Sequence, residues 1–130
     1  MENKVKVSYF PLEEETSRII SAGIEIHKQL GGGFKEIVYK DAFEYELNQR
    51  GIVFEREKKY EVNYKGLVLP HFFYADFIVL DKIILEIKGK EGICDEDYAQ
   101  AINYLKCSGC QVGLIINFGR MKIQIKRVLY

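Results

Sequence analysis

Residues 74–88 read YADFIVLDKIILEIK, and this stretch decides how the rest of the chain is interpreted. Two short apolar runs, FIVL and IILEI, are rich in β-branched residues and indicate two adjoining strands with a tight turn between them. Strands this apolar are normally buried, yet they carry Asp76, Glu86 and Lys88. Burying such groups is costly unless they pair or bind metal. An Asp followed by Glu-x-Lys on paired strands can hold a hard divalent cation beside a water molecule.

Strand parity sets a condition for any site shared by the two strands. Glu86 and Lys88 lie on one face of their strand because side chains alternate. If the turn consisted of Asp81-Lys82 alone, Asp76 would point to the opposite face. A functional site therefore requires a loop with an odd number of residues, or a bulge.

Length and composition predict one domain over residues 1–130, with a sizeable core. Hydrophobic residues make up 48% of the chain, which argues against disorder. No apolar run is long enough to span a membrane, and the N-terminal residues lack the apolar core of a signal peptide, so we expect a cytoplasmic protein. The net charge of zero counts against tight, sequence-independent binding to duplex DNA, but leaves room for a local basic patch.

Periodicity and turn residues predict two helices followed by a series of strands, with one later helix that connects two buried strands. Such an order indicates an α/β or α+β layered domain. In the second helix we expect Tyr45 on the inner face with Phe43 and Leu47. The expected helices are 13–30, 35–49 and 95–109, and the expected strands are 52–55, 60–64, 67–69, one through Asp76, one through Glu86, 112–118 and 121–128.

Several polar residues outside the two strands are further candidates for a site. Glu36 and Tyr39 share a helix face, and Gly33 before them would let the helix start approach another backbone closely; the alternative is a helix stop, a solvated Glu and a core Tyr. Gln100 and Tyr104 also share a face and could orient a phosphate or water, or belong to an ordinary polar helix face.

The cysteines and histidines favour no metal centre of their own. Cys107-Ser-Gly-Cys110 is formally a CxxC, but a second ligand pair is absent, so we expect both thiols to be reduced and metal-free. Stoichiometric zinc in an elemental analysis of the purified protein would contradict this. His71 is interpreted as a surface residue.

The chain carries these motifs in the order Gly33-x-x-Glu36-x-x-Tyr39, Tyr74-Ala-Asp76, Glu86-Ile-Lys88, Ala99-Gln100, Asn103-Tyr104-Leu105 and Gly113-Leu-Ile-Ile-Asn117-Phe118-Gly119. Together they resemble the GxxExxY proteins, a family placed in the PD-(D/E)XK nuclease superfamily. The resemblance covers residues 13 to 127, nearly the whole chain. One departure is Asp97-Tyr98, where many relatives carry a His shortly before the Gln of the helix.

The resemblance implies an α/β domain of restriction-endonuclease-like fold, with a mixed central sheet flanked by helices. It also implies that Asp76 and Glu86 bind Mg²⁺ or Mn²⁺, with the Ile87 carbonyl as a third ligand. Lys88 would position or deprotonate the attacking water and steady the developing phosphate charge.

The same resemblance gives roles to residues on the helices. Glu36 would complete the carboxylate cluster and Gln100 would assist from the crossing helix. Gly33, Tyr39 and Tyr104 would support the site.

These interpretations predict a metal-dependent nuclease that hydrolyses phosphodiester bonds of DNA or RNA. We expect no membrane partner, and a homo-oligomer is compatible with the prediction. Clustered carboxylates suit this chemistry, because they repel one another until a cation arrives. One alternative is an inactive nuclease-fold module that only binds nucleic acid. The other is a structural or assembly partner whose carboxylates pair with Lys88.

Overall fold

The structure of the protein is a computed structural model that describes residues 10–130. The expectation about the N-terminal residues concerns mainly residues 1–9 and lies outside the described residues. The helices and strands are α1 (Glu13–Leu30), α2 (Glu36–Gln49), β1 (Phe54–Tyr64), β2 (Leu67–Val79), β3 (Ile83–Lys88), α3 (Asp95–Ser108), β4 (Val112–Asn117) and β5 (Gln124–Leu129).

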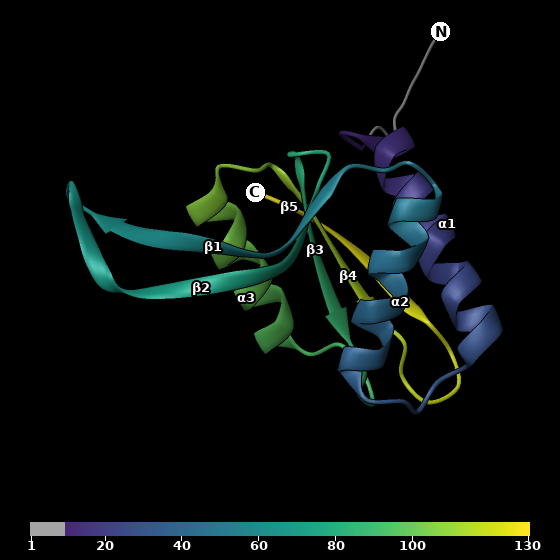
Figure 1. The fold of residues 1–130 in the computed structure, drawn as a ribbon. Helices are drawn as coiled ribbons and strands as arrows, with labels where there is room; N and C mark the ends of the chain where they lie inside the picture. The colour runs from purple at the N-terminus through teal and green to yellow at the C-terminus, as the bar shows by residue number, and fades with distance from the viewer. Residues whose placement is uncertain (1–9) are drawn as a thin grey trace, which may run out of the picture.

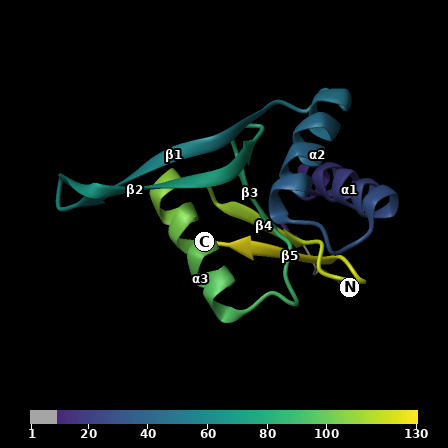
Figure 2. The ribbon, with the colours of Figure 1, turned by 60° about the horizontal axis from the view of Figure 1, so that its bottom comes forward.

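The strands form one mixed sheet in the order β1-β2-β3-β4-β5. β3 and β4 run parallel and are joined through α3, whereas the other neighbouring pairs are antiparallel. Helices α1 and α2 lie together on one side of the sheet, and α3 lies on the other (Figures 1 and 2). The predicted α/β fold with a mixed central sheet flanked by helices is therefore confirmed.

Each side of the sheet has its own hydrophobic core. On the α1–α2 side, Ile19, Phe43 and Phe77 are among the fully buried side chains. On the α3 side, Ile84 and Leu105 belong to a smaller cluster. Strands β3 and β4 are buried along almost their whole length, as expected for parallel strands covered on both faces.

The strand prediction was wrong in number, because four of the expected segments join into two long strands. The end of expected strand 52–55 and the whole of 60–64 belong to β1, and the strand 67–69 continues through Asp76 as β2. Their outer part, residues 58–74, projects from the body as a two-stranded ribbon, here called the hairpin arm (Figures 1 and 2). Most side chains of the arm are exposed, and the polar stretch 56–59 that suggested a break continues the strand with alternating half-buried and exposed residues.

The loop between β2 and β3 satisfies the parity condition. Val79 is opposite Ile83, so the loop holds three residues rather than only Asp81-Lys82. Leu80 and Asp81 both have left-handed backbone conformations, with φ of 55° and 58°. The register is thereby set so that Asp76 comes opposite Glu86, and not opposite Ile87.

The predicted inner face of α2 is only partly right. In α2 the buried residues are Tyr39, Phe43 and Leu47, which follow the four-residue spacing of one helix face. Tyr45 is 62% exposed, so its placement in the core was wrong.

α3 begins with three acidic residues and is capped at its end by Gly109, whose φ of 77° explains why a glycine stands there.

Candidate active site

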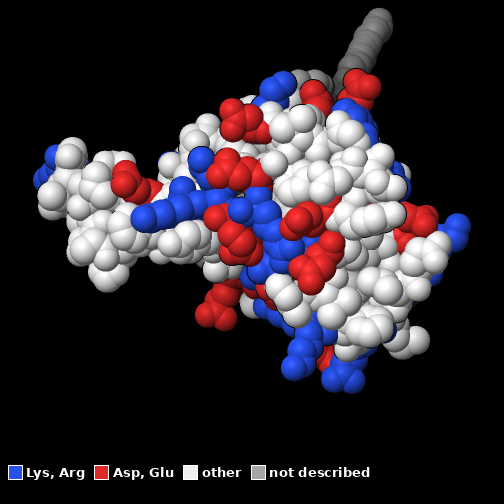
Figure 3. Space-filling view, in the orientation of Figure 1, with Lys and Arg blue, Asp and Glu red and all other residues white. Residues whose placement is uncertain are grey.

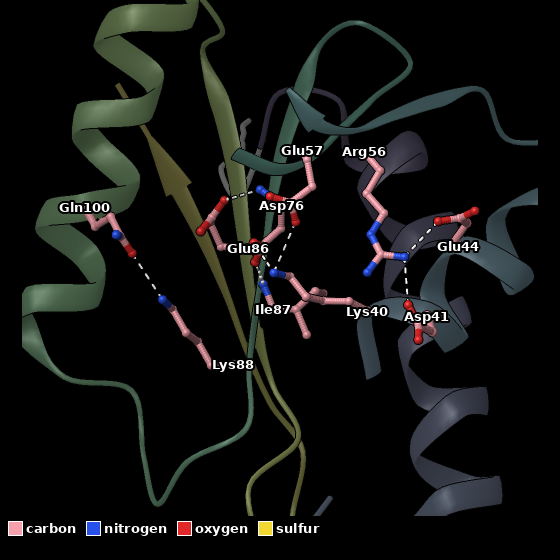
Figure 4. Close-up of polar contacts among 10 residues, drawn as sticks. All are labelled: Lys40, Asp41, Glu44, Arg56, Glu57, Asp76, Glu86, Ile87, Lys88 and Gln100. Carbon is pink, nitrogen blue, oxygen red and sulfur yellow. Dashed lines mark hydrogen bonds and ion pairs between the residues drawn. The ribbon is translucent and has the colours of Figure 1, made fainter. Parts of the chain in front are cut away.

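Asp76 and Glu86 meet where β2 and β3 separate. The last backbone pair between these strands is Phe77 with Leu85. One position further, side chains replace the backbone ladder: the Asp76 N–H donates to Glu86 Oε2 at 2.9 Å, and the Ile87 N–H donates to Asp76 Oδ2 at 2.8 Å (Figure 4). The two carboxylates are therefore fixed by the strands themselves, near the carboxyl end of β3.

Burial makes this pair of carboxylates electrostatically unfavourable in the metal-free protein. Asp76 is 7% exposed and Glu86 is 4% exposed. Burial and the neighbouring Asp76 charge together raise the pKa of Glu86 to about 8, against the opposing effects of the Asp76 amide, Lys88 and Lys40. Without a cation, Glu86 is mainly protonated at neutral pH, and a bound cation would favour its ionised form.

Lys88 follows Glu86 on the same face of β3 and points to α3. Its Nζ donates to Gln100 Oε1 at 3.1 Å and lies 3.9 Å from Asp97 Oδ1 (Figure 4). The Lys88 side chain is 17% exposed, so the ammonium is held at the edge of the site rather than in bulk water. The structure thus brings together Lys88 and Gln100, as the family resemblance implied.

Glu36 stands at the first position of α2 and faces the same cluster. Its side chain is exposed, yet nearby atoms desolvate the carboxyl enough to raise its pKa, and the Asp76 charge raises it further. Lys88, Lys40 and Lys90 act in the opposite direction. Glu36 is therefore coupled to the site by charge, with no hydrogen bond to Asp76 or Glu86 among the described residues.

Sequence reasoning missed Lys40, which lies closest to Asp76 among the cations. Its Nζ is 3.0 Å from Asp76 Oδ1 and 3.2 Å from Glu57 Oε2 (Figure 4). Burial lowers the Lys40 pKa, but the hydrogen bond and charge of Asp76 outweigh this and raise it. The signal that could have found it is its position four residues after Glu36, on the same side of α2.

Glu57 was also missed, and the sequence contains no clear signal for it. It lies on β1 opposite Asp76, at a left-handed position with φ of 56°. Non-glycine residues rarely adopt this conformation. The irregular backbone at Glu57 places its carboxylate within reach of Lys40.

Tyr39 and Gly33 act on the segment that leads into Glu36. Tyr39 is fully buried and stacks on Phe118 with ring centroids 4.1 Å apart, and its hydroxyl donates to the Gly31 carbonyl at 2.7 Å. Gly33 has φ of 98°, and its N–H donates to the Gly119 carbonyl at 2.9 Å.

The close backbone approach expected at Gly33 is made mainly by Gly32. A Cβ on Gly32 would lie 2.3 Å from the Arg120 carbonyl oxygen, whereas a Cβ on Gly33 would meet no atom within 4 Å. Gly33 is therefore required for its conformation, and Gly32 for lack of space.

Tyr104 lies beside the carboxylates on α3 and packs edge-on against Phe73, with ring centroids 5.0 Å apart. Burial raises the pKa of Tyr104 to about 12, with further contributions from the charges of Glu86 and Asp76. It stays protonated at neutral pH and shields the site from one side. His71 lies on the hairpin arm and is exposed, as expected.

The donor atoms at the site suit a hard divalent cation. Two buried carboxylates and a neighbouring backbone carbonyl at Ile87 provide oxygen donors, and burial together with the Asp76 charge raises the pKa of Glu86. Within residues 10–130, no three His, Cys, Asp or Glu side chains gather as a metal cluster, and Lys40 contacts Asp76 instead. Lysine therefore supplies the positive charge at Asp76 in the structure.

Comparison with known proteins defines the class. The PD-(D/E)XK nuclease superfamily matches residues 13–128, so the chain belongs to that superfamily. The crystal structure of SSO0001 is similar with a TM-score of 0.57 at 19% identity; the likeness covers 91% of this chain but only 59% of SSO0001, and it shows the fold alone. A comparison with curated proteins finds no match. None of the described helices is long and apolar enough to cross a membrane.

Proposed function

We propose that this protein is a metal-dependent nuclease of the GxxExxY type that hydrolyses phosphodiester bonds of DNA or RNA, with residues 1–130 forming a single domain. The observation that carries the proposal is the placement of the two carboxylates, in which Glu86 accepts from the Asp76 N–H and Asp76 accepts from the Ile87 N–H, with Lys88 on the same face of β3 as Glu86. Membership of the nuclease superfamily supports the reaction class.

In this proposal the carboxylates of Asp76 and Glu86, with the Ile87 carbonyl, hold Mg²⁺ or Mn²⁺. The cation would supply a nucleophilic water and neutralise phosphate charge. Lys88 holds the attacking water and stabilises the charge that develops on the phosphate oxygens. Gln100 accepts a hydrogen bond from the Lys88 ammonium and fixes its direction, and Glu36 adds negative charge at the rim.

The decisive experiment compares wild type with Lys88→Ala on single- and double-stranded DNA and RNA, in Mg²⁺, Mn²⁺ or EDTA. We expect cation-dependent cleavage by wild type and a loss of about a hundredfold or more in the variant, because a positioned charge is worth a few kcal/mol of barrier. The fold should remain intact, since the β3 neighbours of Lys88 are buried. The matched control is Lys82→Ala, which removes an exposed lysine in the β2–β3 loop.

Equal cleavage by wild type and Lys88→Ala would refute the assigned role.

A second candidate function is a nuclease-fold module that binds nucleic acid without cleaving it. Two observations favour it: the chain has Asp97-Tyr98 where many relatives of the resembled family carry a His shortly before the Gln of the helix, and Lys40 neutralises Asp76. Nucleic-acid binding with no cleavage under any of these conditions would support that module.

A further inference from the structure

Two separate hollows are lined by residues that adjoin Lys88, and in the proposed reaction only Gln100, at one of them, has a role. The first, here called the α3 groove, is about 440 Å³ and runs between α3 and strand β2. The second, here called the glycine hollow, is about 490 Å³. The α3 groove is lined by Phe73, Glu96, Ala99, Gln100, Asn103 and Tyr104, and the glycine hollow by Gly33, Gly89, Lys90, Glu91, Gly119 and Arg120.

Lys88 links the two hollows directly. Its ammonium donates to Gln100 Oε1, which belongs to a lining residue of the α3 groove. Its backbone continues into Gly89 and Lys90, which line the glycine hollow. Lys88 thus adjoins the lining of one hollow through its side chain and that of the other through its backbone.

The chemistry of the α3 groove suits a nucleobase. The half-buried ring of Phe73 offers an apolar surface, the exposed Asn103 amide can donate and accept hydrogen bonds, and the Gln100 amide can donate while its Oε1 accepts from Lys88. Its lining residues include no Lys or Arg to receive a phosphate. Aromatic surfaces and amides of this kind recognise bases whose hydrogen-bonding edges are free.

The chemistry of the glycine hollow suits a phosphate. Three glycines leave the backbone open to close approach, and Arg120 provides positive charge, whereas the Lys90 ammonium is paired with Asp97 at 2.6 Å. Arg120 is paired with Glu91 at 2.8 Å, but both side chains are more than three-quarters exposed. Such an exposed pair contributes little free energy, so a phosphate can replace Glu91 at Arg120.

A duplex fits these observations poorly. Bases in a duplex have their pairing edges occupied, and a protein that grips duplex phosphates needs a broad basic face. The net charge of the chain is zero. On the face shown in Figure 3, basic and acidic side chains are intermixed between the hairpin arm and the α1–α2 pair.

We propose that the substrate is a single strand of nucleic acid, with one unpaired base in the α3 groove and a neighbouring phosphate in the glycine hollow. This inference rests on the proposed function and specifies its substrate class. Single-stranded DNA and RNA share the chemistry used here, and the experiment separates them.

The test measures binding without cleavage, by fluorescence anisotropy in EDTA with labelled single-stranded DNA, single-stranded RNA and the corresponding duplexes. We expect one of the single strands to bind about tenfold or more tightly than its duplex, because stacking and base contacts require an unpaired base. Asn103→Ala and Arg120→Ala should each weaken single-strand binding several-fold, and Arg120→Ala alone should lower the salt dependence, by about one unit of slope. Asn48→Ala and Arg18→Ala are matched controls on exposed positions of α2 and α1, and should bind like wild type.

Equal or tighter binding of duplex would overturn the inference, and so would unchanged binding in both hollow variants. These outcomes are independent of the nuclease proposal. Duplex binding accompanied by Lys88-dependent cleavage would support the nuclease proposal and refute only the inference that the substrate is a single strand. The expected binding pattern without any cleavage would support single-strand binding in the two hollows and favour a module that binds nucleic acid without cleaving it.

Discussion

Two buried aspartates border the candidate site, and each has a lysine beside it, but they are built differently. Asp97, 6% exposed, accepts hydrogen bonds at Oδ2 from the Lys90 ammonium at 2.6 Å and from the Cys94 N–H at 2.9 Å. Asp76, 7% exposed, accepts from the Ile87 N–H and lies beside Lys40, but its own N–H is bound by a second carboxylate, Glu86.

The surroundings explain which aspartate is structural. Burial would raise the pKa of Asp97, but Lys90 and the Cys94 amide outweigh this and lower it, as expected for a helix cap. At Asp76 the adjacent carboxylate remains unfavourably placed, with the pKa of Glu86 raised to about 8. Unfavourable pairs of this kind are common at functional sites, so the same Asp–Lys combination serves stability at α3 and, in our proposal, chemistry at β2.

The largest expected effect separates the two aspartates directly. Asp76→Asn should reduce cation-dependent cleavage by about a hundredfold or more, because the cation loses a charged ligand. Asp97→Asn should reduce it far less, and should instead lower the free energy of unfolding by about 1 kcal/mol through the weakened cap. Initial cleavage rates and thermal unfolding of both variants measure the difference. Similar losses of cleavage in the two variants would contradict the contrast between them.

The next effect concerns pH and metal-free stability. Glu86 has a pKa of about 8 in the folded protein and an ordinary value of 4.5, so the folded state holds the proton more tightly. Its stabilising contribution is complete below pH 4.5 and is lost as pH rises through about 8. Glu86→Gln should remove this loss and be the more stable protein at high pH, by up to a few kcal/mol at about 1.4 kcal/mol per pKa unit.

Thermal unfolding in EDTA across this pH range checks the prediction. Glu61→Gln, at an exposed position on the hairpin arm, is the matched control and should follow wild type. Added Mg²⁺ should stabilise wild type more than Glu86→Gln, because only the glutamate can become a charged ligand. A wild type that gains stability from pH 5 to pH 9 relative to Glu86→Gln would reverse the sign and contradict the burial argument.

The smallest expected effect tests whether Lys40 competes with a cation. Lys40→Met removes the ammonium 3.0 Å from Asp76 Oδ1, so Mn²⁺ affinity should rise several-fold while metal-free stability falls. Lys58→Met is the control, since Lys58 forms a half-exposed pair with Glu55. Isothermal titration with Mn²⁺ gives both affinities. Weaker Mn²⁺ binding in Lys40→Met would mean that Lys40 helps to hold the site in shape.

The strands and their shared face could be predicted because the information is local. Apolar runs around Asp76 and Glu86 identified the two buried strands, and alternation alone placed Glu86 and Lys88 on one side. Parity then limited the loop to an odd length, and three residues are found. The superfamily could be recognised from motif order, and the match over residues 13–128 supports it.

The rest depends on packing between distant elements. Lys40 looks like any solvated lysine on a helix until α2 is placed against β2. Residues 56–59 of β1 are all charged and looked like a break, although in the structure this strand alternates between half-buried and exposed side chains straight through them. Gly32 and Gly33 are equivalent in sequence, and only the approach of the Arg120 backbone distinguishes them.

The left-handed residue Glu57 has a consequence for the protein at high concentration. β1 is an edge strand of eleven residues, and a flat edge of that length offers its free amides and carbonyls to strands of other molecules. The left-handed conformation at Glu57 and the register shift between Glu61 and Asn63 interrupt that edge, and exposed Lys59 and Glu61 add charge along it. The distortion that brings a carboxylate to Lys40 thus also protects the sheet from edge-to-edge aggregation.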